Sequence, residues 1–229
     1  MASFTDIVSL GYRCRTSRRL NDHFGQQRTF PFDRWVTPLK GAMRFVQDWN
    51  VDALYDARAL RETHIDARLA YLKHERYGIK LHHDFPFEGG AKSISPQWRG
   101  WLAEARSRTR YLMDRFEALN RAGNRVLFVR ELDRREERAP DFAFWLKGVV
   151  QQRMRKAETA FLLISPTGVA VDGWTPLKID DPKTDPWEGD ADLWNSALAT
   201  LGHELEPLER PATHPSNRHA GHDPEARAG

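Results

Sequence analysis

The sequence predicts an α/β protein with three layers, a three-layer sandwich in which helices cover both faces of a mainly parallel sheet. Two near-continuous apolar segments carry this prediction, RVLFVRE at 125–131 and AFLLIS at 160–165, because strands of a parallel sheet are buried on both faces. Each follows a segment with helical periodicity, and such helix–strand units form right-handed parallel connections. A third apolar segment, DIVSL at 6–10, ends at Gly11 and adds a first strand.

Two segments with helical features follow the first strand. RTSRRLNDHF at 15–24 precedes Gly25, a typical helix terminator. In the next segment, TPLKGAMRFVQDW, we expect Thr37 to cap the helix and Pro38 to lie in its first turn. Its apolar face is formed by Leu39, Met43, Val46 and Trp49.

Residues 64–87 fit two interpretations, a helix followed by a strand or a hairpin that turns near Gly78. We favour a strand from Ile79 to His83, because Ile79, Leu81 and His83 would then share one face.

The second half of the chain supplies the remaining helices. Ser95 and Pro96 begin a long helix that ends at Gly123, residues 139–156 form another, and Asp190 caps a last helix over 190–205. The stripe of the long helix consists of Leu112, Phe116 and Leu119. From residue 206 Pro, His, Arg, Gly and Ala dominate without apolar periodicity. We therefore expect one α/β domain over 1–205 and a disordered tail over 206–229.

Charge and cysteine content restrict the class of protein. The 35 basic and 32 acidic residues leave a net charge of +3, so the charge balance does not indicate a nucleic-acid partner. One cysteine excludes an internal disulfide. We expect no secretory signal, because MASFTDIVSL has no basic region followed by a long apolar one. No apolar segment of the sequence approaches the roughly 20 residues that span a bilayer. We expect a cytoplasmic protein with no membrane partner, and its oligomeric state stays open.

Cys14 is the first candidate for chemistry. It follows the first strand at the turn into a helix, and a helix N-terminus favours the thiolate form of cysteine. Sites of parallel α/β proteins lie at the carboxyl ends of the strands, which is where this turn falls. The alternative is that Cys14 is a small apolar residue of the core.

A cysteine nucleophile needs a base, usually histidine, and often an acidic group that orients it. The segment LHHDF places His82, His83 and Asp84 at a predicted strand end, where only one of the two histidines can face a given site. A surface pair is the other interpretation. The segment FPFDRW contains Asp33, which could orient a histidine, pair with Arg34 or cap a turn before the next helix.

Two other functions remain open. His64, Asp66, His83 and Asp84 offer imidazole and carboxylate groups that suit a metal-dependent hydrolase, although no established metal-binding spacing is present. The second open function is that of a binding protein, non-catalytic or glycan-related, whose 8 tryptophans line a ligand cleft. The alternative role of these tryptophans is to fill the core. No dinucleotide, Walker or GxSxG motif occurs, and we expect no cofactor.

The order of SLGYRC, FPFDRW followed by TP, HHDF and RVLFVRE resembles a bacterial family of unknown function. Its members are described as candidate papain-like cysteine peptidases, and the resemblance covers about residues 6–135. It implies that Cys14 is the nucleophile, that His83 is the base, and that Asp33 or Asp84 is the third member. Here Arg34 separates Asp33 from the tryptophan, whereas the family pattern has the two side by side.

The resemblance implies a cysteine-nucleophile hydrolase or acyltransferase whose substrate is a peptide, an amide or an ester, including glycan-linked compounds. It also implies a papain-like α+β fold, in which the cysteine helix packs against an antiparallel sheet. We favour the parallel sheet because it rests on two long apolar strands. A cysteine after the first strand of such a sheet has the position of the serine in SGNH-type esterases.

Overall fold

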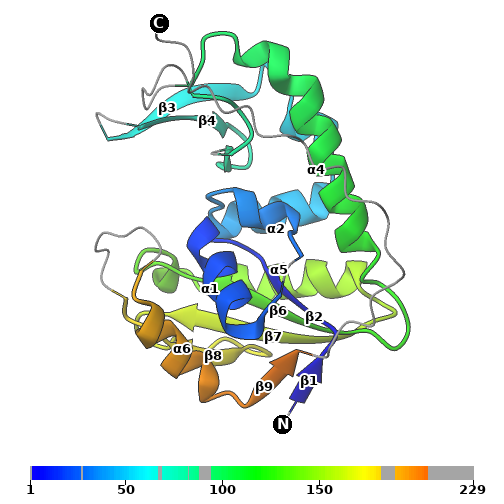
Figure 1. The fold of residues 1–229 in the computed structure, drawn as a ribbon, viewed down its shortest axis with the longest axis vertical. Helices are drawn as coiled ribbons and strands as arrows, with labels where there is room; N and C mark the ends of the chain where they lie inside the picture. Colours follow the sequence, from blue (N-terminus) through cyan, green and yellow to red (C-terminus); the bar gives the residue numbers. More distant parts are fainter. Residues whose placement is uncertain are drawn as a thin grey trace, which may run out of the picture.

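A parallel sheet of four strands forms the centre of the fold (Figure 1). The computed structural model describes residues 2–26, 28–66, 69–81, 83–87, 94–181 and 189–205. In spatial order the strands are β2 (Asp6–Ser9), β6 (Arg125–Glu131), β7 (Glu158–Ser165) and β8 (Thr175–Lys178), and all neighbours are parallel. The predicted α/β class is confirmed, and the central sheet is not the antiparallel sheet that the papain-like alternative requires.

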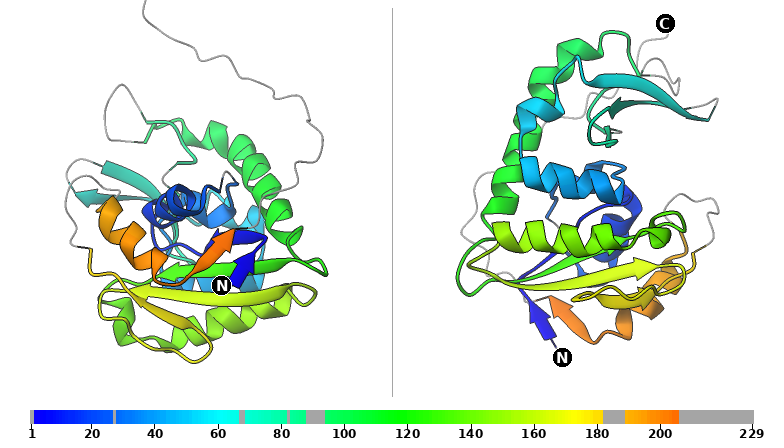
Figure 2. Two further views of the ribbon diagram at one scale, coloured as in Figure 1. Left: turned by 60° about the horizontal axis from the view of Figure 1, so that its bottom comes forward. Right: turned by 180° about the vertical axis from the view of Figure 1, so that it is seen from behind.

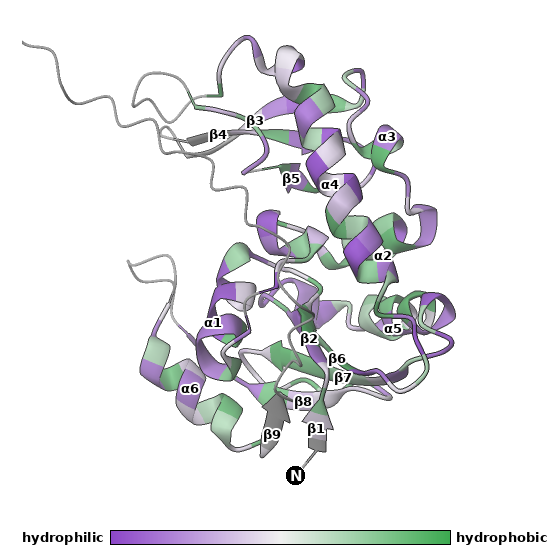
Figure 3. Ribbon diagram, turned by 45° about the vertical axis from the view of Figure 1, so that its right-hand side comes forward, coloured by the Kyte–Doolittle hydropathy of each residue, from purple (hydrophilic) through white to green (hydrophobic). Residues whose placement is uncertain are grey.

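Side chains alternate between the two faces of this sheet and produce two core clusters. Val126 and Phe128 of β6 join one cluster, whereas Leu127 and Val129 join the other. Helices α4 (Leu102–Glu117) and α5 (Asp141–Arg153) contribute to the first cluster, and α1 (Cys14–Phe24) and α6 (Ala191–Ala199) to the second. Figure 3 shows the apolar colouring of the sheet between these helices.

A small antiparallel sheet extends the first cluster. It consists of β3 (Leu60–Asp66), β4 (Leu69–His74) and β5 (Lys80–Leu81). Helix α4 runs from this sheet to the parallel one, and α5 lies between the parallel sheet and α2 (Leu39–Asp48), as Figures 1 and 2 show. The short helix α3 (Val51–Leu54) follows α2.

The hairpin interpretation of the middle segment is confirmed. Gly78 has a φ of 66°, and its N–H donates to the His74 carbonyl, which closes the turn between β4 and β5. Of the strand expected from Ile79 to His83, the described residues that pair with β4 as β5 are Lys80 and Leu81, and His82 lies outside the described residues.

Three expected helix ends are wrong. The long helix that was expected to end at Gly123 ends at Glu117. The N-cap of α2 is Pro38 and no side chain of its own segment caps it, so Thr37 does not have the predicted role. Asp190 does cap α6, with its Oδ1 accepting from the N–H groups of Asp192 and Leu193. The helix ends at Ala199, however, and β9 (His203–Leu205) pairs in parallel with β1 (Ala2–Phe4).

The long helix of the second half begins with a 3-10 turn, η2 (Trp98–Trp101), and its predicted apolar stripe is buried. Two further 3-10 turns are η1 (Pro31–Arg34) and η3 (Glu136–Arg138). Four tryptophans fill the core, which is the packing role that the sequence left open: Trp35, Trp98, Trp174 and Trp194. Among the described helices none is long and apolar enough to cross a membrane. The expected disordered tail lies outside the described residues.

Candidate active site

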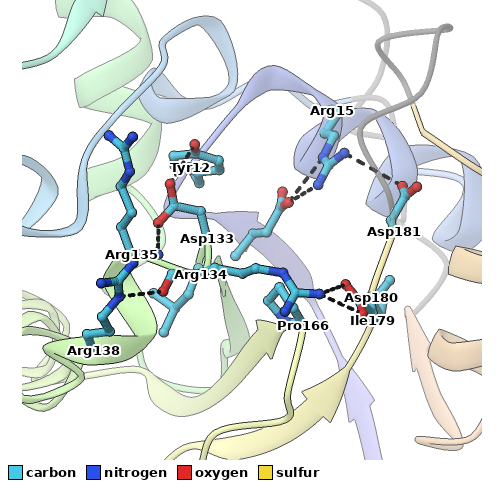
Figure 4. A pocket seen from close by; sticks show the side chains of 12 residues that line it. Tyr12, Arg15, Asp133, Arg134, Arg135, Arg138, Pro166, Ile179, Asp180 and Asp181 are labelled. Atoms are coloured by element: carbon cyan, nitrogen blue, oxygen red, sulfur yellow. Dashed lines mark hydrogen bonds and ion pairs between the residues drawn. The ribbon is translucent and has the colours of Figure 1, made fainter.

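A cavity of about 700 Å³ opens at the carboxyl edge of the parallel sheet (Figure 4). Its lining comes from four segments that follow successive strands. They are the turn after β2, residues 131–135 and 138 at the end of β6, Pro166 after β7, and residues 179–181 after β8. Parallel α/β proteins bind ligands at this edge, because the loops that leave the strands meet there.

The turn between β2 and α1 brings Cys14 to the border of this cavity. Gly11 has a φ of 83°, and a Cβ atom on it would lie 3.1 Å from Arg130 Nη1 and from Thr37 Cβ. A side chain at this position would therefore be both strained and crowded. Tyr12 and Arg15 line the cavity on either side of Cys14, which is half-buried as the first residue of α1.

The first turn of α1 is anchored to the end of β6. Arg15 Nε donates to Glu131 Oε1 at 3.1 Å, its Nη2 donates to the same oxygen, and Thr16 Oγ1 donates to Oε2 at 2.6 Å. Arg15 Nη1 also lies 3.6 Å from Asp181 Oδ2, which accepts from Trp194 Nε1. All these groups are buried, so the position of Cys14 is set by charged contacts on both sides of its helix.

The Cys14 thiol has a raised pKa. Burial is the largest cause, and the negative charge of Glu131 adds to it. Backbone N–H groups of Cys14 and Arg15 and the charge of Arg13 act in the opposite direction. The predicted helix start is therefore present, but the expectation that it would depress the pKa of the thiol is wrong, because desolvation outweighs the N–H groups.

A second ion pair, between Arg130 and Glu136, supports the Gly11 turn between β2 and α1. Arg130 is fully buried, and its Nη1 donates to the carbonyls of Leu10 and Thr37 at 2.9 Å each. Its Nη2 lies 2.8 Å from Glu136 Oε2, while Glu136 Oε1 accepts from the Leu39 N–H at 2.6 Å. Glu136 thus caps α2 from a distant segment, and one ion pair holds β6, the Gly11 turn and α2 together.

Tyr12 links the same turn to the cavity wall. Its hydroxyl donates to Asp133 Oδ2 at 3.0 Å and accepts from Arg13 at 3.4 Å. Asp133 Oδ1 accepts from the N–H groups of Arg135 and Glu136 at 2.9 and 2.8 Å, so Asp133 fixes the start of η3. Burial raises the pKa of Tyr12, which stays a neutral hydrogen-bond donor.

His83 and Asp84 lie beyond β5, in a second group of polar residues. The Asp84 carboxylate is buried and accepts from Trp35 Nε1 and Tyr55 Oη at 2.8 Å each and from Arg34 Nε at 3.3 Å. Arg34 also donates to the His83 carbonyl. Asp84 therefore holds the loop that presents His83, and His83 itself is exposed.

The segments of Cys14 and His83 are connected by two short backbone contacts. The Tyr12 carbonyl accepts from the Thr37 N–H at 2.9 Å, and Val36 pairs with Lys80 at the start of β5. The charge of Arg13 is among the causes that lower the pKa of Lys80, after burial and Lys73. The two side chains nevertheless have different charged neighbours. Arg13 and Glu131 act on the Cys14 thiol, whereas Arg34 and Asp84 act on the His83 imidazole.

Asp33 occupies a capping position in η1. Its Oδ2 accepts from the Phe30 N–H at 2.7 Å, and its Oδ1 is buried without a hydrogen-bond partner in the described structure. Of the roles that the sequence offered for Asp33, the structure shows the capping of a turn. Arg34 forms its ion pair with Asp84 and not with Asp33. Burial raises the pKa of Asp33 to about 7, against the smaller effects of the Phe30 N–H and Arg115.

Asp33 should make stability fall as the pH rises. Its pKa of about 7 in the folded state exceeds the value of about 3.9 for an unfolded chain, so the folded state binds the proton more tightly between these pH values. We expect Asp33→Asn to raise the free energy of unfolding at pH 8, by at most about 4 kcal/mol, and by less at pH 5. Urea unfolding at both pH values measures this, with the exposed Asp192→Asn as control. An equal effect of Asp33→Asn at both pH values would contradict the assignment.

The described side chains contain no group of three His, Cys, Asp or Glu residues that could hold a metal ion. Of the four residues of the metal hypothesis, His83 and Asp84 are described, whereas the side chains of His64 and Asp66 lie outside the described part. That hypothesis therefore gains no support from the described site.

Sequence reasoning missed the residues that organise the cavity. Arg130 and Glu131 end a buried apolar strand, and charged residues in such a strand signal buried partners. Tyr12, Asp133 and the arginines after β6 gave no comparable signal, because their neighbours come from other strands.

The fold and the cavity together define an α/β protein with a polar site at the carboxyl edge of its sheet. No family model, curated protein or solved structure matches this chain. The resemblance to the cysteine-peptidase family therefore rests on the sequence motifs alone.

Proposed function

We propose that this protein is a cysteine-dependent hydrolase or acyltransferase acting on a peptide, an amide or an ester. The observation that carries the proposal is the position of Cys14. It is the first residue of α1, at the carboxyl edge of a parallel sheet and beside a cavity of ligand size. A residue with only a packing role needs no such position, and Cys14 is only half-buried.

The chemistry assigned to these residues is acyl transfer through a thioester. Cys14 Sγ attacks the substrate carbonyl while the His83 imidazole takes the thiol proton. The carbon–nitrogen or carbon–oxygen bond then breaks, and the imidazolium gives its proton to the leaving group. Water, or an acceptor hydroxyl or amine, attacks the thioester after losing a proton to His83. The carbon–sulfur bond then breaks, the acyl group leaves on the water or acceptor, and the His83 imidazolium returns its proton to the Cys14 thiolate.

The start of α1 offers hydrogen-bond donors for this reaction. The first N–H groups of a helix lack partners within the helix, and no side chain caps α1. Those of Cys14 and Arg15 act directly on the thiol. We assign them to the negative oxygen that develops on the substrate carbonyl.

The protonation states favour a general-base mechanism over a preformed ion pair. Although His83 is exposed as a residue, partial desolvation of its ring and the charge of Arg34 lower the pKa of its imidazole, which is therefore neutral at pH 7. The raised pKa of Cys14 leaves the thiol protonated at the same pH. His83 must come within hydrogen-bond distance of the thiol, and such contacts often tighten only in the substrate complex.

The pH dependence of Cys14 alkylation tests the pair. We expect the rate with iodoacetamide to increase through a first step below pH 6.5, where His83 becomes a base, and through a second above about pH 8.5, where the thiol ionises by itself. His83→Ala should remove the first step and lower the rate at pH 7 at least tenfold.

His23→Ala is the matched control, because His23 lies in the last turn of the same helix α1. It should leave both steps unchanged. Superimposable profiles of the wild type and His83→Ala would show that His83 does not serve Cys14, and the proposed base would have to be abandoned.

We place this activity in the cytoplasm. A reducing compartment keeps a single cysteine as the free thiol that the reaction needs.

A further inference from the structure

The cavity beside Cys14 contains more charge than acyl transfer requires. Four arginines and four carboxylates line it, namely Arg15, Arg134, Arg135 and Arg138 with Glu131, Asp133, Asp180 and Asp181. Which of these charges are neutralised inside the protein decides what the cavity can bind.

The carboxylates all have partners within the protein. Glu131 accepts from Arg15 Nε at 3.1 Å. Asp180 accepts from Arg134 Nη2 at 2.8 and 2.9 Å. Asp133 accepts from Tyr12 and from two backbone N–H groups. Asp181 accepts from Trp194 Nε1 at 2.9 Å and from the Asp190 N–H at 3.2 Å.

Arg135 and Arg138 differ from the other two arginines. Within the described part of the chain, neither guanidinium is bonded to a carboxylate. The interaction seen for Arg138 is a long contact of 3.5 Å from its Nε to the Arg134 carbonyl. Both side chains are exposed at the cavity wall, so their charge is available to a ligand.

The local backbone places the two arginines together. They precede and end the single turn η3, and residues three apart in a 3-10 turn project to the same side. Figure 4 shows both on the same side of the cavity, across from Arg15 and Asp181. In that view the Arg135 side chain extends away from the Arg138 guanidinium, so each arginine offers its own anion-binding group. A guanidinium binds the oxygens of a phosphate or carboxylate in a bidentate manner.

We propose that this cavity binds a small molecule through an anionic oxygen group, a phosphate or a carboxylate, held by Arg135 and Arg138. The inference rests on the proposed function in taking this molecule to be the acyl substrate or the acyl acceptor. The volume of about 700 Å³ suits a small molecule rather than a macromolecular partner.

Calorimetric titration of the full chain at low, constant ionic strength tests the site. The probes are inorganic phosphate, pyrophosphate and citrate, so that phosphate and carboxylate sources are distinguished. We expect saturable binding of at least one probe and an at least tenfold weaker Kd in the double variant Arg135→Gln/Arg138→Gln. Both residues are exposed, so the variant should fold, which its thermal unfolding verifies.

The matched control is Arg121→Gln/Arg155→Gln, which removes two exposed arginines that precede β6 and β7 at the opposite edge of the sheet. Its Kd should stay within twofold of the wild type. Absence of saturable binding, equal affinity of the wild type and the Arg135/Arg138 variant, or an equal loss in the control would each overturn the anion site.

Cys14→Ala separates the two proposals. It should bind the probe as the wild type does, because Cys14 does not line the cavity. Normal anion binding without any acyl turnover by the wild type would overturn the proposed function and leave the anion site in place. Turnover that depends on Cys14 without anion binding would do the reverse.

Discussion

Cys14→Ala should lower kcat/KM for acyl transfer by at least about 10³-fold, because the variant has no atom that can form the thioester. A panel of activated esters, thioesters and peptide amides measures the loss against the wild type. Cys14→Ser should be impaired as well, since a hydroxyl is a weaker nucleophile than a thiol beside the same base.

We expect the Cys14 variants to stay folded, so a loss of activity would not result from unfolding. Cys14 is half-buried, so its truncation should change the free energy of unfolding by only about 1 kcal/mol. Arg18→Ala, on the exposed face of the same helix, is the control and should retain full activity. Full turnover by Cys14→Ala would reduce Cys14 to a packing residue and end the proposed function.

Arg130→Ala should lower the free energy of unfolding by about 3–5 kcal/mol, because it leaves Glu136 partly buried without its cation. It also removes the donors to the carbonyls of Leu10 and Thr37, which hold the turn before Cys14. Urea unfolding measures the change directly.

Arg134→Ala is the matched control on the same segment. Arg134 also pairs with a carboxylate at 2.8 Å, but both partners are largely exposed, so its removal should cost less than about 1 kcal/mol. Similar losses in the two variants would show that burial does not distinguish the two ion pairs.

The fold was predictable where local pattern and burial agree. Residues 125–131 form the predicted strand, because an apolar run of that length needs cover on both faces. Strand β8 carries one buried side chain, Leu177, and contains a proline, so it has no apolar pattern. Residues 203–205 were expected to continue the last helix, but they form a strand because β1 offers a pairing partner elsewhere in the chain, at residues 2–4.

The candidate site was predictable only in part. Gly11 and the amphipathic segment after it indicated a strand-to-helix turn, and the turn places Cys14 at the start of α1. His83 and Asp84 are adjacent in sequence but have different environments, since the Asp84 carboxylate is buried and His83 is exposed. No local pattern distinguishes these two environments, because Trp35, Tyr55 and Arg34 approach Asp84 from other elements.

The sequence by itself determined the parallel α/β class and the turn that carries Cys14, and it offered the hairpin at Gly78 as one of two interpretations. These features depend on apolar periodicity and on glycine conformation, both of which are local properties. Only the tertiary structure decided the partners of the buried charges, such as Arg15 with Glu131, and therefore the raised pKa of Cys14. A buried charge is stable only beside its partner, and here the partner lies 116 residues away along the chain.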